Sequence, residues 1–211
     1  MIYIDKHKVI FIHLTKTGGE SVLAALPNSK EAVGNSFWTR KRHIPVSAIL
    51  DESFLCKYSD QLDLLPNFRR DGVHDFKPGK HIYKIQQKWN SLRITFVRNP
   101  WARLVSEYHY NIDKGEEPRS FEEVVYSLLK HPDDIWKWSQ MRWLCHKGKC
   151  YADRVYRLEY DKQKFNADFN VELPHKNKSI HNAYREYYDD TTRRIVELVY
   201  ADDIKEFGYE F

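Results

Sequence analysis

Runs of apolar residues along the chain alternate with amphipathic stripes. Residues 9–12 are β-branched or aromatic without interruption, which predicts a strand buried on both faces of a mainly parallel sheet. Residues 93–98 predict a second strand, and residues 154–160 predict a third. Because glycine- or proline-containing turns and helical patterns follow the first two strands, the order of elements predicts an α/β fold.

The helical patterns show which faces should be buried. After Asn99-Pro100, apolar residues recur at helical spacing in a stripe made of Trp101, Leu104, Val105, Tyr108 and Ile112. Further patterns predict a short helix after Pro45 and helices over residues 121–130, residues 135–145 and two stretches of the tail, with Ile195, Leu198 and Val199 on one face. Tryptophans of the 135–145 helix could stack on a sugar ring, but they are expected in the core. We predict one domain over residues 1–211, with a central, mainly parallel sheet flanked by helices.

The turn Lys16-Thr17-Gly18-Gly19 joins the first strand to a helix that begins near Ser21. Glycine permits unusual backbone angles and, without a Cβ, a close approach of the backbone to a ligand. The start of a helix presents N–H groups and a positive dipole end, so this turn could bind phosphate or sulfate beside Lys16. It could equally be a plain connection. The lysine precedes the glycines, so the Walker pattern of ATP- and GTP-hydrolysing enzymes is absent.

A second candidate anion site follows the second strand. Arg98 ends that strand and Ser106 lies on the next helix, at the sheet edge where open α/β folds bind ligands. With Lys16, these residues imply a ligand that carries two separated anionic groups.

Charge and composition narrow the classes of partner. The 211 residues include 34 Lys plus Arg and 30 Asp plus Glu, and the net charge of +4 permits an anionic partner but is too small to predict nucleic-acid binding. Neither an apolar leader nor an apolar run of about 18 residues or more occurs. We therefore predict a soluble, cytoplasmic chain with no membrane-spanning segment.

Three cysteines exclude a full disulfide framework and favour a reducing compartment. Cys145-His146 and Cys150 leave two local possibilities open, a zinc site or a disulfide. No fourth metal ligand at a familiar spacing is evident, and we expect no metal.

Three segments resemble the sulfotransferases that use 3′-phosphoadenosine 5′-phosphosulfate (PAPS). Residues 11–21 (FIHLTKTGGES) resemble their phosphosulfate loop, PKTGG-x-S, with Thr15 in place of Pro and Glu20 in place of Thr or Ser. Residues 94–108 resemble their 3′-phosphate element, an Arg followed by a Ser eight residues later. The tail from His175 resembles the carbohydrate-type branch of the family, the Golgi-type, family 2-like enzymes.

The resemblance implies a P-loop-like sulfotransferase fold and assigns roles to residues. The 5′-phosphate would be held by the backbone N–H groups of Thr17, Gly18, Gly19, Glu20 and Ser21. Lys16 would neutralise the bridging oxygen as the S–O bond breaks, Arg98 and Ser106 would hold the 3′-phosphate, and Asn177, Lys178 and Ser179 would close over the nucleotide.

A base must accept the proton of the acceptor hydroxyl, and histidine suits this role near neutral pH. We favour His43, which precedes a short helix as a histidine does in related carbohydrate sulfotransferases. His74 and Glu20 are the second and third candidates. His13 is expected to be a packed or hydrogen-bonded residue at the end of the first strand.

The acceptor is inferred only by class. Basic residues Arg40, Arg42, Arg69 and Arg70, with His74, could steer an acidic saccharide, and they could equally form solvated surface. The expected acceptor is a carbohydrate hydroxyl. A small phenol, a lipid headgroup or a peptide tyrosine remains an alternative, as do a non-catalytic nucleotide- or polyanion-binding protein and a nucleotide kinase.

Overall fold

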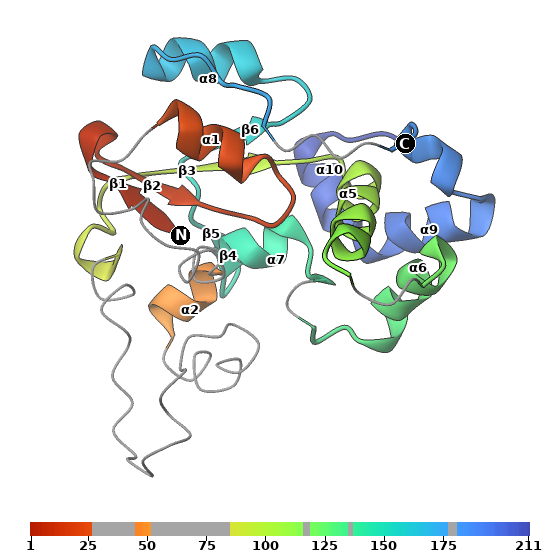
Figure 1. Ribbon diagram of the computed structural model, residues 1–211. Coiled ribbons are helices and arrows are strands. Elements are labelled where there is room, and N and C mark those ends of the chain that lie inside the picture. Colours follow the sequence, from red (N-terminus) through yellow and green to blue (C-terminus); the bar gives the residue numbers. More distant parts are fainter. Residues whose placement is uncertain (27–44, 52–84, 116–118, 135–136, 177–180) are drawn as a thin grey trace. The chain divides into compact units, whose positions relative to one another are not determined.

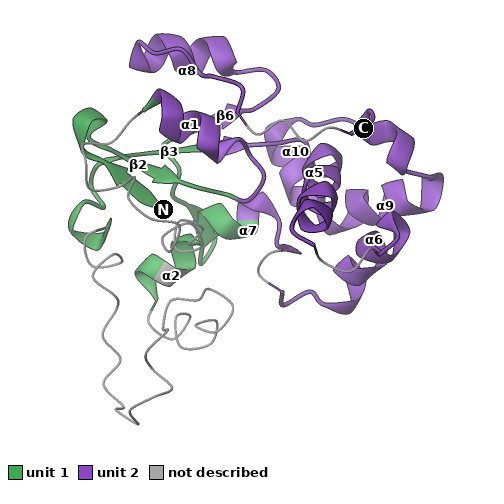
Figure 2. Cartoon of the chain, in the orientation of Figure 1, with its two compact units in different colours: residues 1–14, 26–95, 142–155 green, residues 15–25, 96–141, 156–211 purple. Residues whose placement is uncertain are grey.

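The computed structural model describes residues 1–26, 45–51, 85–115, 119–134, 137–176 and 181–211 (Figure 1). The chain falls into two compact units (Figure 2). Unit 1 comprises residues 1–14, 26–95 and 142–155, and unit 2 comprises residues 15–25, 96–141 and 156–211. Within the described residues, no helix is long and apolar enough to cross a membrane. The single-domain assignment stays a prediction.

The sheet confirms the predicted α/β class. Its strands, in the order β1-β2-β3-β6, are β1 (Ile2–Ile4), β2 (Val9–Ile12), β3 (Leu92–Val97) and β6 (Arg154–Arg157). β1 is antiparallel to β2, and β2 is parallel to β3. The Asp153 N–H donates to the Arg93 carbonyl and the Leu158 N–H to the Val97 carbonyl, so β6 runs parallel to β3. The first strand of the sheet, β1, was not predicted.

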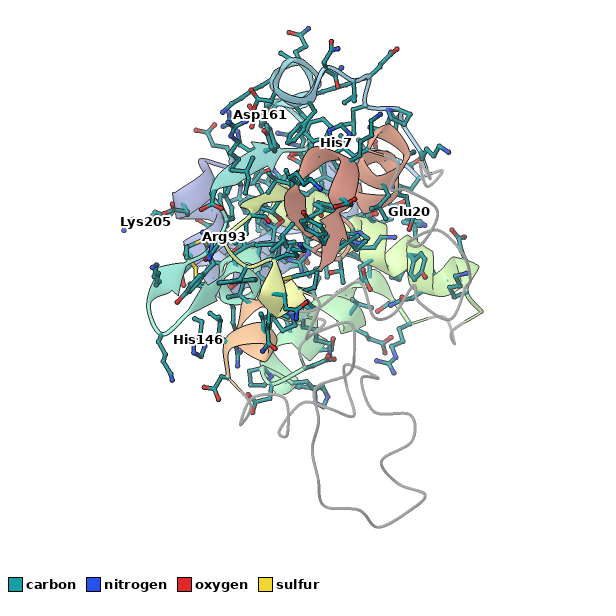
Figure 3. All side chains as sticks on the ribbon, turned by 90° about the vertical axis from the view of Figure 1, so that its left-hand side faces the viewer. His7, Glu20, Arg93, His146, Asp161 and Lys205 are labelled. Carbon is teal, nitrogen blue, oxygen red and sulfur yellow. A yellow bond between two sulfur atoms is a disulfide. The ribbon has the colours of Figure 1, made fainter. Side chains whose placement is uncertain are left out.

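Unit 1 is built on β2, in which all four side chains are buried, as predicted for a strand covered on both faces. The Thr95 hydroxyl of β3 donates to the Ile12 carbonyl at 2.9 Å. Arg93, labelled in Figure 3, pairs through two guanidinium nitrogens with the Asp153 carboxylate. The unit also contains a 3₁₀ turn (Asp5–His7) and α2 (Val46–Leu50), which begins after Pro45 as predicted.

A two-stranded hairpin, β4 (Cys145–His146) and β5 (Lys149–Cys150), follows α7. Lys147 and Gly148 both have positive φ, which is the requirement of a type I′ turn. Cys145 and Cys150 face each other across the hairpin and are disulfide-bonded. This bond answers the question that the sequence left open between zinc and a disulfide.

Unit 2 is mainly helical. Its helices are α1 (Gly19–Ala25), α5 (Pro100–Asp113), α6 (Phe121–Lys130), the start of α7 (Gln140–Leu144), α8 (Lys162–Phe169), α9 (Asp190–Val199) and α10 (Ala201–Phe207), with a 3₁₀ turn at Tyr184–Tyr187. α5, α6 and α9 share a core that contains Trp101, Val105, Val125 and Val196. On α8, which was not predicted, Phe165 packs against the rings of Phe96 and Tyr156.

Some predicted faces and lengths were wrong. Ile112 is 39% exposed because the buried stripe of α5 ends before the last turn of that helix. Leu198 is 76% exposed, since the inward face of α9 follows Thr192, Ile195 and Val196. The helix predicted over residues 135–145 is only the short α7, within the residues that the structure describes. The tryptophans Trp138 and Trp143 of that predicted helix are buried, as expected. His13 is also packed as expected, because it is buried and stacked on Phe11.

Candidate functional site

The loop from Thr15 to Ser21 has two residues with left-handed backbone. Lys16 has φ 59° and Gly18 has φ 79°. The Gly18 carbonyl accepts from the N–H groups of Ser21 (2.9 Å) and Val22 (3.2 Å), which starts α1. Gly19 is already the first residue of that helix. The unusual backbone angles predicted for Gly18 and Gly19 are therefore found at Gly18 and at Lys16, where a non-glycine residue in this conformation costs about 1–2 kcal/mol.

Gly18 has little room for a side chain. A Cβ on Gly18 would lie 2.7 Å from Leu158 Cδ1, closer than two carbon atoms can pack. Leu158 directly follows β6, so the glycine lets the loop rest on the end of that strand. The sequence had suggested that the missing Cβ makes room for a ligand, whereas the structure fills that space with a side chain of the protein itself.

The Lys16 side chain lies along α5. Its Nζ is 4.0 Å from the centroid of the Tyr110 ring, a cation–π contact. Burial lowers the pKa of the Lys16 amine, and the positive charge of Arg98 acts in the same direction, whereas Glu107 and Asp113 oppose the shift. An anion bound beside Lys16 would favour its charged form, so this position suits a negatively charged ligand.

Arg98 connects the second motif to the loop. It is the first residue after β3, and its Nη1 donates to the Lys16 carbonyl at 3.2 Å. Burial lowers the pKa of the Arg98 guanidinium, and Glu159 partly offsets this effect. Arginine still stays charged, because its ordinary pKa lies far above neutral. The structure therefore brings Lys16 and Arg98 together, although 82 residues separate them in the sequence.

The backbone after β3 is held by side chains. Gln140 bonds both the N–H and the carbonyl of Arg98, and the Glu159 carboxylate accepts from the Asn99 N–H at 3.0 Å. Asn99 caps α5 by accepting from the N–H groups of Trp101 and Ala102. Gln140 and Glu159 were missed by the sequence reasoning, because only their long-range partners mark them as residues that hold the site.

Ser106 lies on α5 and is 5% exposed. Residues 106, 110 and 113 share one face of a helix because they are spaced by four and three positions. Lys16 contacts that face at Tyr110. Of the sequence-predicted residues, Lys16 and Arg98 are in contact, and Ser106 shares the face of α5 that Lys16 touches at Tyr110.

The tail reaches the loop directly. The backbone N–H of Lys176 donates to the Ser21 Oγ at 3.0 Å, so the chain just before Asn177 lies against the start of α1. Glu20, labelled in Figure 3, is exposed in the first turn of the same helix. The remaining predicted residues fall outside the described part of the chain, namely Arg40, Arg42, His43, Arg69, Arg70, His74, Asn177, Lys178 and Ser179. Among the described residues, no group of His, Cys, Asp and Glu could hold a metal ion.

The family model of the sulfotransferase family, in its family 2 branch, matches residues 1–210. This chain belongs to the sulfotransferase family. It is therefore an enzyme of the PAPS-dependent sulfotransferase class, as the loop and the Arg98 element had indicated. No curated protein and no solved structure gives a significant match to this sulfotransferase.

Proposed function

We propose that this sulfotransferase binds PAPS at the loop of residues 16–21 and transfers the sulfuryl group to a carbohydrate hydroxyl. The observation that carries the proposal is the contact between the two motifs, in which the Arg98 guanidinium donates to the Lys16 carbonyl. Two cations held together beside a helix start suit a ligand with two anionic groups. Buried hydroxyls of Thr17, Ser21 and Ser106 add hydrogen-bonding groups to the same elements.

The residues fit the donor as follows. The N–H groups at the start of α1 would hold the 5′-phosphate, and Arg98 with Ser106 would hold the 3′-phosphate. Asn177 to Ser179 would close over the nucleotide, a role that the contact of Lys176 with Ser21 supports. The donor, when bound, supplies the sulfuryl group and a bisphosphate leaving group.

Transfer moves one group and one proton. The bond between sulfur and the bridging oxygen breaks, a bond forms between sulfur and the acceptor oxygen, and the hydroxyl proton passes to a base. Lys16 would stabilise the negative charge that develops on the bridging oxygen, an effect worth about 10²- to 10³-fold in rate for one preorganised donor. We propose His43 as the base, with His74 and Glu20 as the alternatives.

The proposal is tested by transfer of labelled sulfate from PAPS to a panel of saccharides, phenols and tyrosine peptides. We expect transfer to an acidic saccharide in particular. We expect Lys16→Ala to abolish turnover mainly through the chemical step, and Arg98→Ala mainly through donor affinity. Lys114→Ala is the matched control, because the Lys114 Nζ lies 5.6 Å from the same Tyr110 ring and has no assigned role. Its turnover should stay near the wild-type value.

Near-normal turnover of Lys16→Ala at saturating donor would refute the assignment of Lys16. A His43→Ala protein that binds adenosine 3′,5′-bisphosphate without turning over would support the base assignment, and unchanged turnover would move it to His74. Binding of the bisphosphate with no transfer to any acceptor would favour a non-catalytic binding protein. Transfer only to phenols or peptides would replace the carbohydrate assignment.

A further inference from the structure

The backbone of Arg98 lies one residue beyond the sheet. The last backbone bond between β3 and the β6 chain runs from the Leu158 N–H to the Val97 carbonyl, at 2.8 Å. At Arg98 the side chain of Gln140 takes the place of a neighbouring strand. Its Oε1 accepts from the Arg98 N–H at 2.8 Å, and its Nε2 donates to the Arg98 carbonyl at 2.9 Å. Both polar groups of this backbone position are therefore satisfied by one amide.

Gln140 is itself fixed by Asp203 of α10. Both side chains are fully buried. One carboxylate oxygen of Asp203 accepts from the Gln140 N–H (2.7 Å) and from its Nε2 (3.2 Å), and the other accepts from the Met141 N–H (2.8 Å). The Arg98 N–H can only donate, so the amide oxygen must face it, and the amide nitrogen is left to face Asp203. Asp203 thereby holds the amide in this orientation.

The carboxylate of Asp203 has a cation nearby. The Arg103 Nη1 lies 4.0 Å from Asp203, and the Arg103 Nη2 donates to the Trp138 carbonyl at 3.0 Å. Arg103 also lies over the ring of Tyr200, 5.6 Å from its centroid. Burial raises the pKa of the Asp203 carboxyl, and the positive charge of Arg103 and the hydrogen bonds from residues 140 and 141 oppose this shift.

We propose that Gln140, oriented by Asp203, is a positioning residue for the donor site: it fixes the backbone of Arg98 and, through the bond from Arg98 Nη1, the carbonyl of Lys16. The inference rests on the proposed function, in which Arg98 holds the 3′-phosphate. Without Gln140 each peptide group next to Arg98 keeps one hydrogen bond, from the Leu158 N–H to the Val97 carbonyl and from the Asn99 N–H to Glu159, and loses the other. The backbone from which the guanidinium extends is then held less tightly. The side chain acts through Arg98 and touches no reacting atom.

The test compares the affinity for adenosine 3′,5′-bisphosphate, measured by calorimetric titration, in Gln140→Met and in the unchanged protein. Methionine has a similar length and makes neither bond to Arg98. We expect the dissociation constant to rise about tenfold, which corresponds to about 1.4 kcal/mol. Gln86→Met is the matched control, because the Gln86 amide donates to the Ile49 carbonyl at 2.9 Å within unit 1. Its affinity should change less than about twofold.

A double-mutant cycle separates positioning from general stability. In an Arg98→Ala protein, Gln140→Met should cause no further loss of affinity, because the side chain through which it acts is gone. An equal loss in both backgrounds would overturn the inference. If Gln140→Met fails to fold, Gln140→Asn carries the same comparison, since it keeps a buried amide but is too short by one methylene to hold Arg98 and Asp203 together.

Failure of the proposed function gives a different result. If the unchanged protein does not bind the bisphosphate, the donor assignment fails. Amide hydrogen exchange then tests, without any ligand, whether Gln140 holds the backbone of Arg98. Exchange of the Arg98 N–H should be faster in Gln140→Met, whereas exchange of the Leu158 N–H, which lies in the sheet ladder, should not change. Unchanged protection of the Arg98 N–H would overturn the positioning role.

Discussion

The close contact between Gly18 and Leu158 allows a stability prediction with an internal control. Gly18→Ala introduces two costs, a side chain at φ +79° and a Cβ that lies 2.7 Å from Leu158 Cδ1. The left-handed conformation costs about 1–2 kcal/mol for an alanine. The clashing atom is the end of the half-buried Leu158 side chain, which can leave its rotamer at a cost of about 0.5–1.5 kcal/mol. We therefore expect a total loss of about 1.5–3.5 kcal/mol in the free energy of unfolding.

Gly115 provides the matched control. Its φ is also +79°, and a Cβ at this position would have no atom of the described residues within 4 Å. Gly115→Ala should therefore show the backbone cost alone, about 1–2 kcal/mol. The difference between the two variants measures the contact with Leu158. Urea unfolding followed by circular dichroism gives both free energies, and the slope with urea should stay the same in the two variants.

A second comparison assigns the difference to Leu158. In a Leu158→Ala background the atom that clashes is gone, so Gly18→Ala should cost no more than Gly115→Ala does in the unchanged protein. The reasoning is refuted if Gly18→Ala and Gly115→Ala are equally destabilising, or if Leu158→Ala does not reduce the cost of Gly18→Ala. Either result would mean that the loop does not rest on the end of β6.

Two further predictions concern stability. The pKa of Asp153 is lowered by its bond from Arg93, so the pair stabilises the fold fully above the ordinary value of 3.8 and less as the pH falls through the lower folded pKa. Below about pH 4, the urea midpoint should therefore fall more steeply for the wild type than for Asp153→Asn, and parallel curves would contradict the pairing. Ser120 and Glu123 form a capping box at α6, so Ser120→Ala should cost about 1 kcal/mol and lower the melting temperature by about 2–4 °C in calorimetry. An unchanged melting temperature would show that the cap contributes nothing.

Elements with strong local signals could be predicted from the sequence. The helix over residues 121–130 was placed at its observed bounds, because its apolar residues keep helical spacing and its ends carry local signals. β2 and β3 were found through short, nearly continuous apolar runs. By contrast, β1 has three residues and each strand of the β4–β5 hairpin has two, which is too short for a periodic pattern. The class of fold follows from the long elements, and these short strands do not change it.

Faces that depend on a distant partner were predicted less well. Leu198 fits the apolar spacing of α9 as well as Val199 does, but the α6 and α5 side chains pack around Ile195 and Val196 instead. Gly18 was recognised as a turn residue, while its neighbour Leu158 lies 140 residues away in the sequence. Local periodicity has no information about such a contact. For the same reason the sequence suggested Arg98 as a site residue and did not suggest Gln140, whose bonds to Arg98 span 42 residues.

The bond between Arg98 and Lys16 changes how the two motifs should be understood. The sequence suggests two separate binding elements, one for each anionic group of the donor. In the structure the Arg98 guanidinium donates to the carbonyl of Lys16, a residue whose left-handed backbone is itself costly. Arginine has five N–H donors in a planar fork, so one bond to the loop still leaves others for a phosphate. The strained position of Lys16 is therefore supported by the residue that is expected to hold the other end of the donor, and we expect the two motifs to act as one site.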